Sequence, residues 1–557
     1  MTVLTPKLVT TLRTYTLQQF IADAGAGIVV GIVALPLAIA FAIASGVTPE
    51  RGIFTAIVAG FLISALGGSR VQIGGPTGAF VVIVYGIVQQ YGMAGLTIAT
   101  IMAGVILLAL GFARLGGAIK FIPYPVTAGF TTGIAVIIFT SQIKDFLGLS
   151  MGPLPESFVE KWLAYAREAG AVSLPALGVA LGSLLIITAW PRVSRRIPAP
   201  FVAIVAGSVA VALLDLPVDT IGSRFGSIPT SLPAPSIPSI AFADAMALVG
   251  PAFTIALLAA IESLLSAVVA DGMIGGRHRS NMELVAQGVA NIASPLFGGI
   301  PATGAIARTA TNVRSGGRTP VAGMIHALVL LLILLAFGRW AEAIPMPTLA
   351  AILVVVAYHM SEWRSFRNEL RGPRSDVIVL LTTFALTVMV DLTVAVQVGL
   401  VLAAFLFMRR MSEVTNVAEI GENFTDPVGD SGTFSSREGP LPKGVQLYAI
   451  DGPFFFGAAD KFREALGQVS SAPRVLILVM RRVPAIDSTG INALRNVIER
   501  FQKDGTRVIL VGPRAQPLAA MAQTGILTAI GEDGVVPDLD SAIALAEQQG
   551  TGHPAPG

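Results

Sequence analysis

The chain of 557 residues contains no cysteine, only 4 histidines and few charged residues. Without cysteine the fold has no disulfide and no thiolate metal site, and four histidines give no basis for a histidine-rich metal cluster. Charged residues make up 13%, about half of the share that is typical of a soluble globular domain. So few charges leave too little polar surface to cover a globule of this size.

Apolar residues are abundant instead, at 54% of the chain with a mean hydropathy of +0.75. This excess needs an apolar solvent, and we expect the lipid bilayer to be a partner. The net charge of +3 is small and its basic residues lie in separate loops, which argues against a nucleic-acid partner. Residues 1–20 are polar and lack the pattern of a cleaved signal peptide, so we expect a cytoplasmic N-terminal segment.

Apolar segments that cross or nearly cross a bilayer recur through residue 411. They predict a polytopic α-helical transmembrane domain over 21–411 with fourteen spans. Cations gather in alternate loops, near 114–120, 192–196, 277–279, 314–318 and 364–374, which predicts a multi-pass inner-membrane protein with both termini in the cytoplasm. The exception is the outer loop 148–172, whose residues 155–169 are typical of an amphipathic interfacial helix. The predicted spans are 24–45, 51–66, 77–91, 95–113, 122–143, 173–190, 199–215, 247–270, 283–297, 303–313, 320–338, 347–360, 375–391 and 393–408.

The composition changes at residue 411. Residues 412–443 are polar and rich in Gly and Pro, which predicts a linker. A small α/β domain is expected over 444–548, and a disordered tail over 549–557. Its expected strands are 445–450, 454–456, 474–480 and 507–511, and its expected helices are 459–466 and 488–502.

Two motifs in the transmembrane part echo each other, Gly74–Ala79 and Gly298–Ala305, and each precedes a short apolar segment. We interpret each as an extended stretch followed by a half-helix that starts inside the membrane, in halves of opposite topology over about 21–215 and 247–411. Two such helix starts facing each other would bind an anion without a metal. Thr77 and Thr303 could add hydroxyl donors, and Gly78 and Gly304 could let the ligand approach the backbone. The plainer alternative is that both motifs are kinks and glycine packing contacts.

Two ionisable residues fall inside spans, Glu262 and Arg308. A charge within a span is expensive and usually faces a cavity or a partner. Burial disfavours the charged carboxylate, which makes Glu262 a candidate proton carrier. Arg308 could attract an anion, pair with Glu262, or extend to the cytoplasmic face. Three acids at span ends are expected to cap helices and to be hydrated: Asp23, Asp271 and Asp391.

Four stretches together resemble the sulfate permease (SulP) family of anion transporters, over nearly the whole chain. They are ALPLAIAFAIASGVTPERG, FIPYPVTAGFTTGIAVII, SNMELVAQGVANIASPLFGGIPATGAIARTATNVRSGGRTP and IPMPTLAAILVVVAYHM. The resemblance implies a 7+7 inverted repeat in which a core domain (spans 1–4 and 8–11) moves against a gate domain (spans 5–7 and 12–14) as an elevator. It also implies a homodimer and a cytoplasmic STAS domain. Carried over by motif, the starts of the third and tenth helices are Thr77, Gly78 and Ala79, and Ala302, Thr303 and Gly304.

The resemblance also implies roles in coupling for the ionisable residues. Glu262 falls on the eighth-helix acid of proton-coupled relatives, and Ser266 stands where sodium-coupled bicarbonate relatives carry a hydroxyl near their Asp. Arg308 matches a tenth-helix Arg that sodium-dependent members tend to lack, which favours proton coupling. Many members carry Pro-Gln in the first helix, whereas this chain has Pro36-Leu37. Because the Gln side chain would line the site, Leu37 implies a more apolar pocket. Such a pocket makes bicarbonate or a small carboxylate a more credible substrate beside sulfate.

In the soluble domain, Asp487-Ser488-Thr489-Gly490 resembles the STAS loop that is phosphorylated in anti-sigma antagonists. Thr489 and Ser488 are therefore candidate regulatory residues, and the domain is expected to bind a cytoplasmic protein. The alternative is that Asp487 or Ser488 simply caps the following helix.

The expected function is secondary active transport of a small anion, with no cofactor and with proton symport as the coupling. No GxxxxGK[ST] loop is present in the sequence, so ATP-driven pumping is not expected, and no enzyme activity is indicated. The alternatives are sodium-coupled bicarbonate symport, uncoupled anion exchange or channel-like conduction, and a membrane-anchored STAS signalling protein.

Overall fold

The computed structural model describes residues 4–117, 122–152, 154–155, 157–194, 197–236, 238, 242–419, 441–467 and 472–548. The predicted tail 549–557, most of the predicted linker 412–443, and parts of two cation-rich loops lie outside these residues. The chain divides into two compact units, Met1–Ala403 and Ala404–Gly557.

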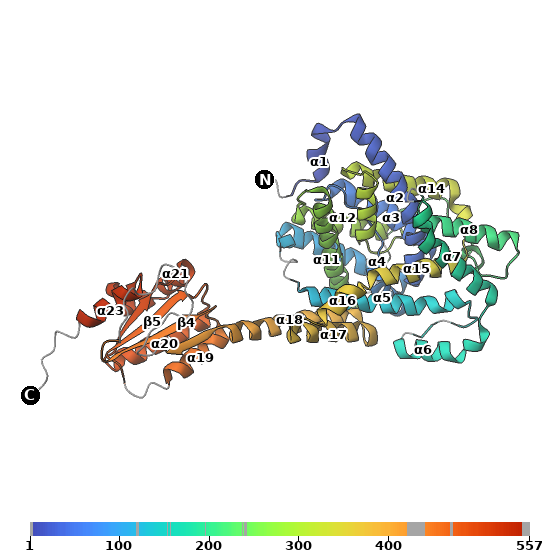
Figure 1. The fold of residues 1–557 in the computed structure, drawn as a ribbon. Helices are drawn as coiled ribbons and strands as arrows, with labels where there is room; N and C mark the ends of the chain where they lie inside the picture. The colour runs from blue at the N-terminus through green and yellow to red at the C-terminus, as the bar shows by residue number, and fades with distance from the viewer. Residues whose placement is uncertain are drawn as a thin grey trace, which may run out of the picture. The chain divides into compact units, whose positions relative to one another are not determined.

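The first unit is a bundle of helices (Figure 1). Its longest helices start at residues suited to a helix N-terminus. Thr16 and Gln19 form a reciprocal capping box before α2, and Pro49 and Pro320 occupy the first turns of α3 and α14. In chain order the helices are α1 (Lys7–Thr11), α2 (Leu17–Ala44), α3 (Pro49–Leu66), α4 (Val81–Phe112), α5 (Tyr124–Leu147), α6 (Phe158–Arg167), α7 (Leu174–Val193), α8 (Ala199–Leu213), α9 (Ile221–Phe225), α10 (Phe242–Ala247), α11 (Val249–Ile274), α12 (Ser280–Leu296), α13 (Ile306–Arg314), α14 (Pro320–Phe337), α15 (Met346–Met360), α16 (Trp363–Glu369), α17 (Arg374–Met389) and α18 (Leu392–Val414).

Within the described residues, nine helices are long and apolar enough to cross a membrane. The predicted spans 77–91 and 95–113 are two helical stretches of α4, which meet at a kink at Gly92, where φ is +65° and ψ is −168°. A left-handed backbone at this position favours glycine and separates the two predicted spans. The predicted spans 199–215, 283–297, 303–313 and 375–391 correspond to the shorter helices α8, α12, α13 and α17. The exact number of spans stays a prediction.

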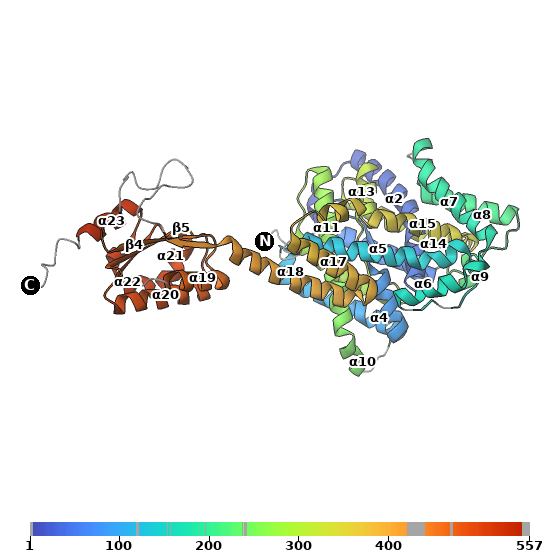
Figure 2. The same cartoon turned by 60° about the horizontal axis from the view of Figure 1, so that its bottom comes forward.

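The helices pack in two groups. In the first, α4 packs on α11 and α12, and α14 packs on α2 and α3. In the second, α5 packs on α15 and α17, and α7 packs on α8 and α15; Figure 2 shows α5 running beside α17. The first group contains the predicted core spans and the second contains the predicted gate spans.

The expectation that Asp23 is a hydrated residue at the end of a span was wrong. Asp23, in α2, is fully buried and so is not accessible to bulk water. It accepts hydrogen bonds from the backbone N–H groups of Arg318 (2.8 Å) and Thr319 (3.2 Å), and from the Tyr15 hydroxyl (2.9 Å). These two N–H groups belong to the residues just before α14 begins at Pro320, so Asp23 fastens α2 to the start of α14. Asp391 caps α18 as expected, through Val394 N at 2.9 Å.

The second unit contains a five-stranded sheet of order β3-β4-β5-β6-β7, in which β3 is antiparallel to β4 and the other pairs are parallel. Alternate residues of β5 enter two apolar clusters, one shared with α19, α20, α21 and α22 and the other with α23, so helices cover both faces. The elements are β3 (Asn416–Glu419), β4 (Val445–Asp451), α19 (Phe456–Gly467), β5 (Val475–Arg482), α20 (Ser488–Lys503), β6 (Arg507–Val511), α21 (Ala515–Gln523), α22 (Ile526–Ile530), β7 (Val535–Val536) and α23 (Leu539–Gln548).

Two predictions for this unit were wrong in detail. The predicted linker begins too early, because α18 continues to Val414 and residues 416–419 pair with the edge of β4. Residues 454–456 were expected to form a strand. Only Phe454 makes a strand-like bridge, to Ile486, because α19 begins at Phe456.

Candidate functional site

The two repeated motifs meet in space. Residues Gly74–Gly75 (β1) and Thr303–Gly304 (β2) form an antiparallel pair, with Gly74 opposite Gly304 and Gly75 opposite Thr303. Antiparallel pairing is what two equivalent stretches from halves of opposite topology would make. The prediction of paired broken segments is therefore confirmed at the level of the backbone.

The helix starts differ from the predicted ones. Thr77 precedes a short 3₁₀ turn over Gly78–Phe80, so Gly78 and Ala79 begin the helical part as expected. On the other side, Ala302, Thr303 and Gly304 lie in the extended stretch, and helix α13 begins only at Ile306. The later start follows from the backbone hydrogen bonds of this stretch, which run to β1 and to side chains instead of along a helix.

Side chains from neighbouring helices fasten both extended stretches. Asn291 of α12 donates to Ala302 O (2.8 Å) and accepts from Ala302 N (2.9 Å). Thr309 of α13 accepts from Ile73 N at 3.0 Å, and Thr55 of α3 accepts from Ile300 N at 2.7 Å. These side chains, which sequence reasoning missed, fix the crossing point of the two motifs.

Helix α11 passes beside this crossing and receives both motif hydroxyls. Thr77 Oγ1 donates to Glu262 Oε2 at 2.9 Å, and Thr303 Oγ1 donates to Ala259 O at 2.8 Å. The half-buried Glu262 thus lies beside the turn at which the predicted third span begins, and its role as the coupling residue stays a prediction. Ser266, one turn further, is buried and donates to Thr309 Oγ1 at 3.1 Å. Its predicted role toward a coupling ion stays a prediction.

Arg308 is buried beside the crossing, with 2% of its surface exposed. It does not extend to the surface, so that expectation was wrong. Its Nη2 donates to Pro76 O, and its Nη1 lies next to Gly75 with no hydrogen-bond partner in the described part of the chain. No ion pair within 4.0 Å joins it to Glu262 among the described residues. The guanidinium therefore offers one free donor edge and a positive charge at the crossing.

The two motif glycines serve different purposes. A Cβ atom at Gly78 would lie 3.0 Å from Met360 Sδ and 3.3 Å from both Ile138 Cδ1 and Phe41 Cε1. Gly78 is thus where side chains of α2, α5 and α15 converge. At Gly304, a Cβ would overlap the Gln72 amide, so the expectation that Gly304 makes room for a ligand was wrong: it makes room for Gln72.

A second buried acid, Glu283 of α12, was missed by sequence reasoning. Its Oε2 accepts from Gly68 N (2.9 Å) and Ser69 N (3.1 Å), and its Oε1 accepts from Ser263 Oγ and Gln287 Nε2, both at 3.1 Å. Four donors satisfy the carboxylate, so Glu283 fastens the loop that leads into β1. The sequence signal that could have revealed this acid is Glu283 followed by Gln287, four residues later in the same buried helix.

In the second unit, Asp487 caps α20, with its Oδ1 accepting from Gly490 N at 2.7 Å. The capping alternative is therefore confirmed for Asp487. Ser488 and Thr489 are exposed in the first turn. Their phosphorylation stays a prediction.

Known proteins match both units of the chain. Residues 20–383 match the Sulfate permease family and residues 440–542 match the STAS domain. The "Putative sulfate transporter YvdB" of Bacillus subtilis is 45% identical over 521 residues, covering 93% of this chain and 96% of the relative. The "Bicarbonate transporter BicA" of Picosynechococcus sp. is 29% identical over 545 residues, covering 94% of each.

Solved structures share the fold. SLC26A9 superposes with a TM-score of 0.87 over 98% of this chain and 93% of that chain, at 19% identity. The transmembrane domain of a cyanobacterial BicA gives a TM-score of 0.61 over 70% of this chain and 98% of that domain, at 30% identity. The chain therefore belongs to the sulfate permease family and carries a STAS domain after its multi-pass membrane unit.

Proposed function

We propose that the chain is a secondary active transporter that carries a small anion, by proton symport and an elevator-type movement of the core against the gate. The observation that supports this most is the free Nη1 donor of buried Arg308 at the crossing of β1 and β2. A buried cation without a paired acid is costly, and an anion would supply the missing charge and acceptor.

The position of Glu262 supports the proposed coupling. An ionised Glu262 would repel an anion at the crossing, and protonation removes that repulsion. Binding of the anion and binding of the proton therefore favour each other, which is the linkage that a symporter needs. The Thr77–Glu262 hydrogen bond places the carboxyl group beside the start of α4.

The substrate is proposed as sulfate, bicarbonate or a small carboxylate. Similar chains are named sulfate and bicarbonate transporters. Leu37 stands in α2 where many members carry Gln, which favours a less polar anion. We further propose a homodimer in the inner membrane with cytoplasmic termini, and a STAS domain that binds a cytoplasmic protein.

The test is uptake into proteoliposomes of sulfate, bicarbonate, succinate and fumarate, with and without sodium, at two pH values. We expect uptake driven by an inward proton gradient without sodium. Glu262→Gln should abolish the gradient-driven component and leave anion binding in place, whereas Glu160→Gln, an exposed acid on α6, should behave like wild type. Normal gradient-driven uptake by Glu262→Gln would overturn the coupling assignment. A strict sodium requirement would favour sodium symport, and uptake that needs only a trans anion would favour exchange.

A further inference from the structure

Two connections of the chain lead from one helix group to the other near the end of α5. One runs from α8 to α11 and includes α9, and the other runs from α14 to α15. Residues 219–221 of the first connection pair with residues 344–346 of the second, through a bridge between Thr220 and Pro345 and two backbone hydrogen bonds of 2.8 and 3.0 Å. We call these paired stretches and α9 the joint. Since Met346 is the first residue of α15, the joint is attached to the start of that helix.

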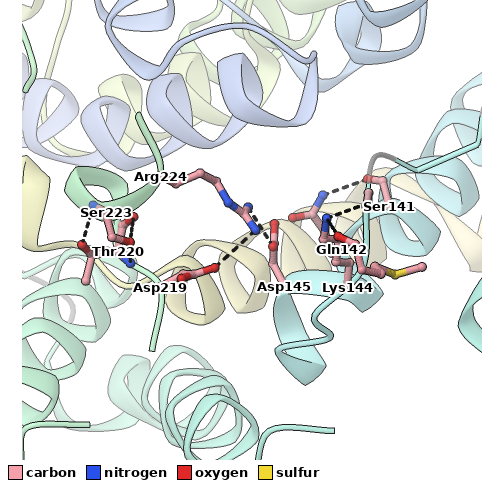
Figure 3. A network of polar contacts seen from close by, with 10 residues as sticks. Ser141, Gln142, Lys144, Asp145, Asp219, Thr220, Ser223 and Arg224 are labelled. Atoms are coloured by element: carbon pink, nitrogen blue, oxygen red, sulfur yellow. Dashed lines mark hydrogen bonds and ion pairs between the residues drawn. The ribbon is translucent and has the colours of Figure 1, made fainter. Parts of the chain in front are cut away.

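Arg224, in the last turn of α9, extends the joint to α5. Its Nη1 lies 2.8 Å from Asp145 Oδ1, near the end of α5, and Figure 3 shows this pair together with Asp219, which lies 3.7 Å from Nη2. The side chain of Asp145 is 16% exposed, whereas that of Asp219 is 67% exposed. An ion pair shielded from water is screened less by salt than an exposed one. The joint thus ties the end of α5 to the start of α15.

The short helix α9 is held by its cap and by the second connection. Thr220 and Ser223 form a reciprocal capping box at its start, with hydrogen bonds of 2.9 and 3.2 Å (Figure 3). A Cβ atom at Gly222 would lie 3.0 Å from Glu342 Cβ, so the second connection packs directly on the helix. Arg224 therefore projects from a fixed helix.

The two helices that the joint ties together carry side chains that close on Gly78. A Cβ atom at Gly78 would lie 3.3 Å from Ile138 Cδ1 of α5 and 3.0 Å from Met360 Sδ of α15. We call this apolar contact the seal. Asp145 follows Ile138 by seven residues, which is two helical turns and about 10 Å along α5. A shift of the end of α5 therefore moves Ile138 relative to Gly78.

We propose that Arg224 is a positioning residue for transport, which holds α5 through Asp145 so that the seal on Gly78 stays closed. A closed seal excludes an anion, because a charged group that enters an apolar contact loses its hydration without gaining hydrogen bonds. An anion then passes only with the movement of the core, and transport stays coupled. The inference rests on the proposed coupled transport and names the contact that keeps it coupled.

The test uses the absence of cysteine from the chain. Ile138 is fully buried, so Ile138→Cys introduces a single buried thiol, and its rate of labelling by a membrane-permeant maleimide in proteoliposomes reports how often the seal opens. In this background we expect Arg224→Gln to speed labelling about two- to five-fold, the upper part of the range for exposed ion pairs. Asp145→Asn should give the same rise. The double variant should label no faster than either single variant, because the two side chains act as one pair.

Two controls separate the seal from other effects. Asp219→Asn removes the exposed carboxylate of the joint and should leave the labelling of Ile138→Cys unchanged. Ala99→Cys places a thiol at a fully buried position of α4, and its labelling should be the same with and without Arg224→Gln. A general loosening of the fold would instead speed labelling at both thiols.

The flux of radiolabelled sulfate is measured in parallel with the proton flux, which an entrapped pH dye reports. The chain for this measurement keeps Ile138. In Arg224→Gln the ratio of anion flux to proton flux should rise above the wild-type ratio, because an open seal lets anion pass without a proton.

Five results would overturn the role of Arg224. These are unchanged labelling of Ile138→Cys in Arg224→Gln, an equal effect of Asp219→Asn, equal acceleration at Ala99→Cys, additive effects in the double variant, and an unchanged flux ratio. Each of them leaves the proposed transport standing if the wild type shows uptake driven by a proton gradient. Absence of such uptake by the wild type would overturn the proposed function, and the labelling rates would still decide whether Arg224 positions α5.

Discussion

The Nη1 of Arg308, which is unpaired among the described residues, leads to the first prediction. Replacing this residue should weaken anion binding strongly and change the stability of the fold only a little. Arg308→Met removes the charge and keeps a long apolar side chain. An anion oxygen about 4 Å from the guanidinium, at an effective dielectric constant of about 20, gains about 4 kcal/mol. Loss of that gain corresponds to about a thousand-fold weaker binding. We therefore expect saturable uptake to disappear at substrate concentrations that saturate the wild type.

The stability of the same variant should change little. The lost hydrogen bond to Pro76 O is worth about 1.5–3 kcal/mol because the donor is charged, and a buried N–H without a partner costs about 1–3 kcal/mol. These contributions nearly cancel, so the free energy of unfolding should change by less than about 2 kcal/mol.

The assay pairs anion uptake in proteoliposomes with thermal unfolding followed by tryptophan fluorescence. Arg308→Lys, which keeps the charge, should retain most of the uptake, and Arg314→Met should match wild type because Arg314 is exposed on the same helix. An Arg308→Met protein that unfolds easily yet keeps a wild-type KM would refute this reasoning. In that case the guanidinium would have a structural role only.

Two further predictions concern the neighbours of the site. Thr77→Val removes the hydroxyl that donates to Glu262, so the pH dependence of uptake should shift while uptake persists, and an unchanged pH profile would contradict the proposed link between this hydrogen bond and coupling. Gly304→Ala places a methyl group on the Gln72 amide, so the free energy of unfolding should fall by about 1–3 kcal/mol, and the double variant with Gln72→Ala should recover part of that loss. Additive effects in the thermal unfolding of these variants would mean that Gly304 and Gln72 do not interact.

The parts of the site that could be predicted from the sequence include those that carry the repeated Gly/Pro/Thr motif. The two Gly/Pro/Thr motifs have matching positions in the two halves, which predicted that they meet at one place, whereas their hydrogen bonding as β1 and β2 was not predicted. Glu262 was recognisable because a charged residue is rare inside an apolar span. Its contact with Thr77, across 185 positions of the chain, was not predicted from the sequence.

The parts that sequence missed are side chains that bind backbone groups. Thr309 and Glu283 bind backbone groups more than 200 positions away, and Asn291 binds Ala302 beyond the end of its own helix. Such pairings follow no helical period. Asp23 was misjudged for the same reason, since its partner at the start of α14 is 295 residues away. The late start of α13 also followed from tertiary hydrogen bonds instead of local helix propensity.

The fastening of both extended stretches by Asn291, Thr55 and Thr309 has a consequence for energetics. Because side chains of the core itself hold the crossing, the donors around an anion would keep their arrangement in the proposed movement of the core against the gate. Such a carrier would have nearly the same intrinsic affinity at both faces of the membrane. The free energy for accumulating its substrate would then come from the gradient of the coupled ion, and its transport would reverse readily when that gradient reverses.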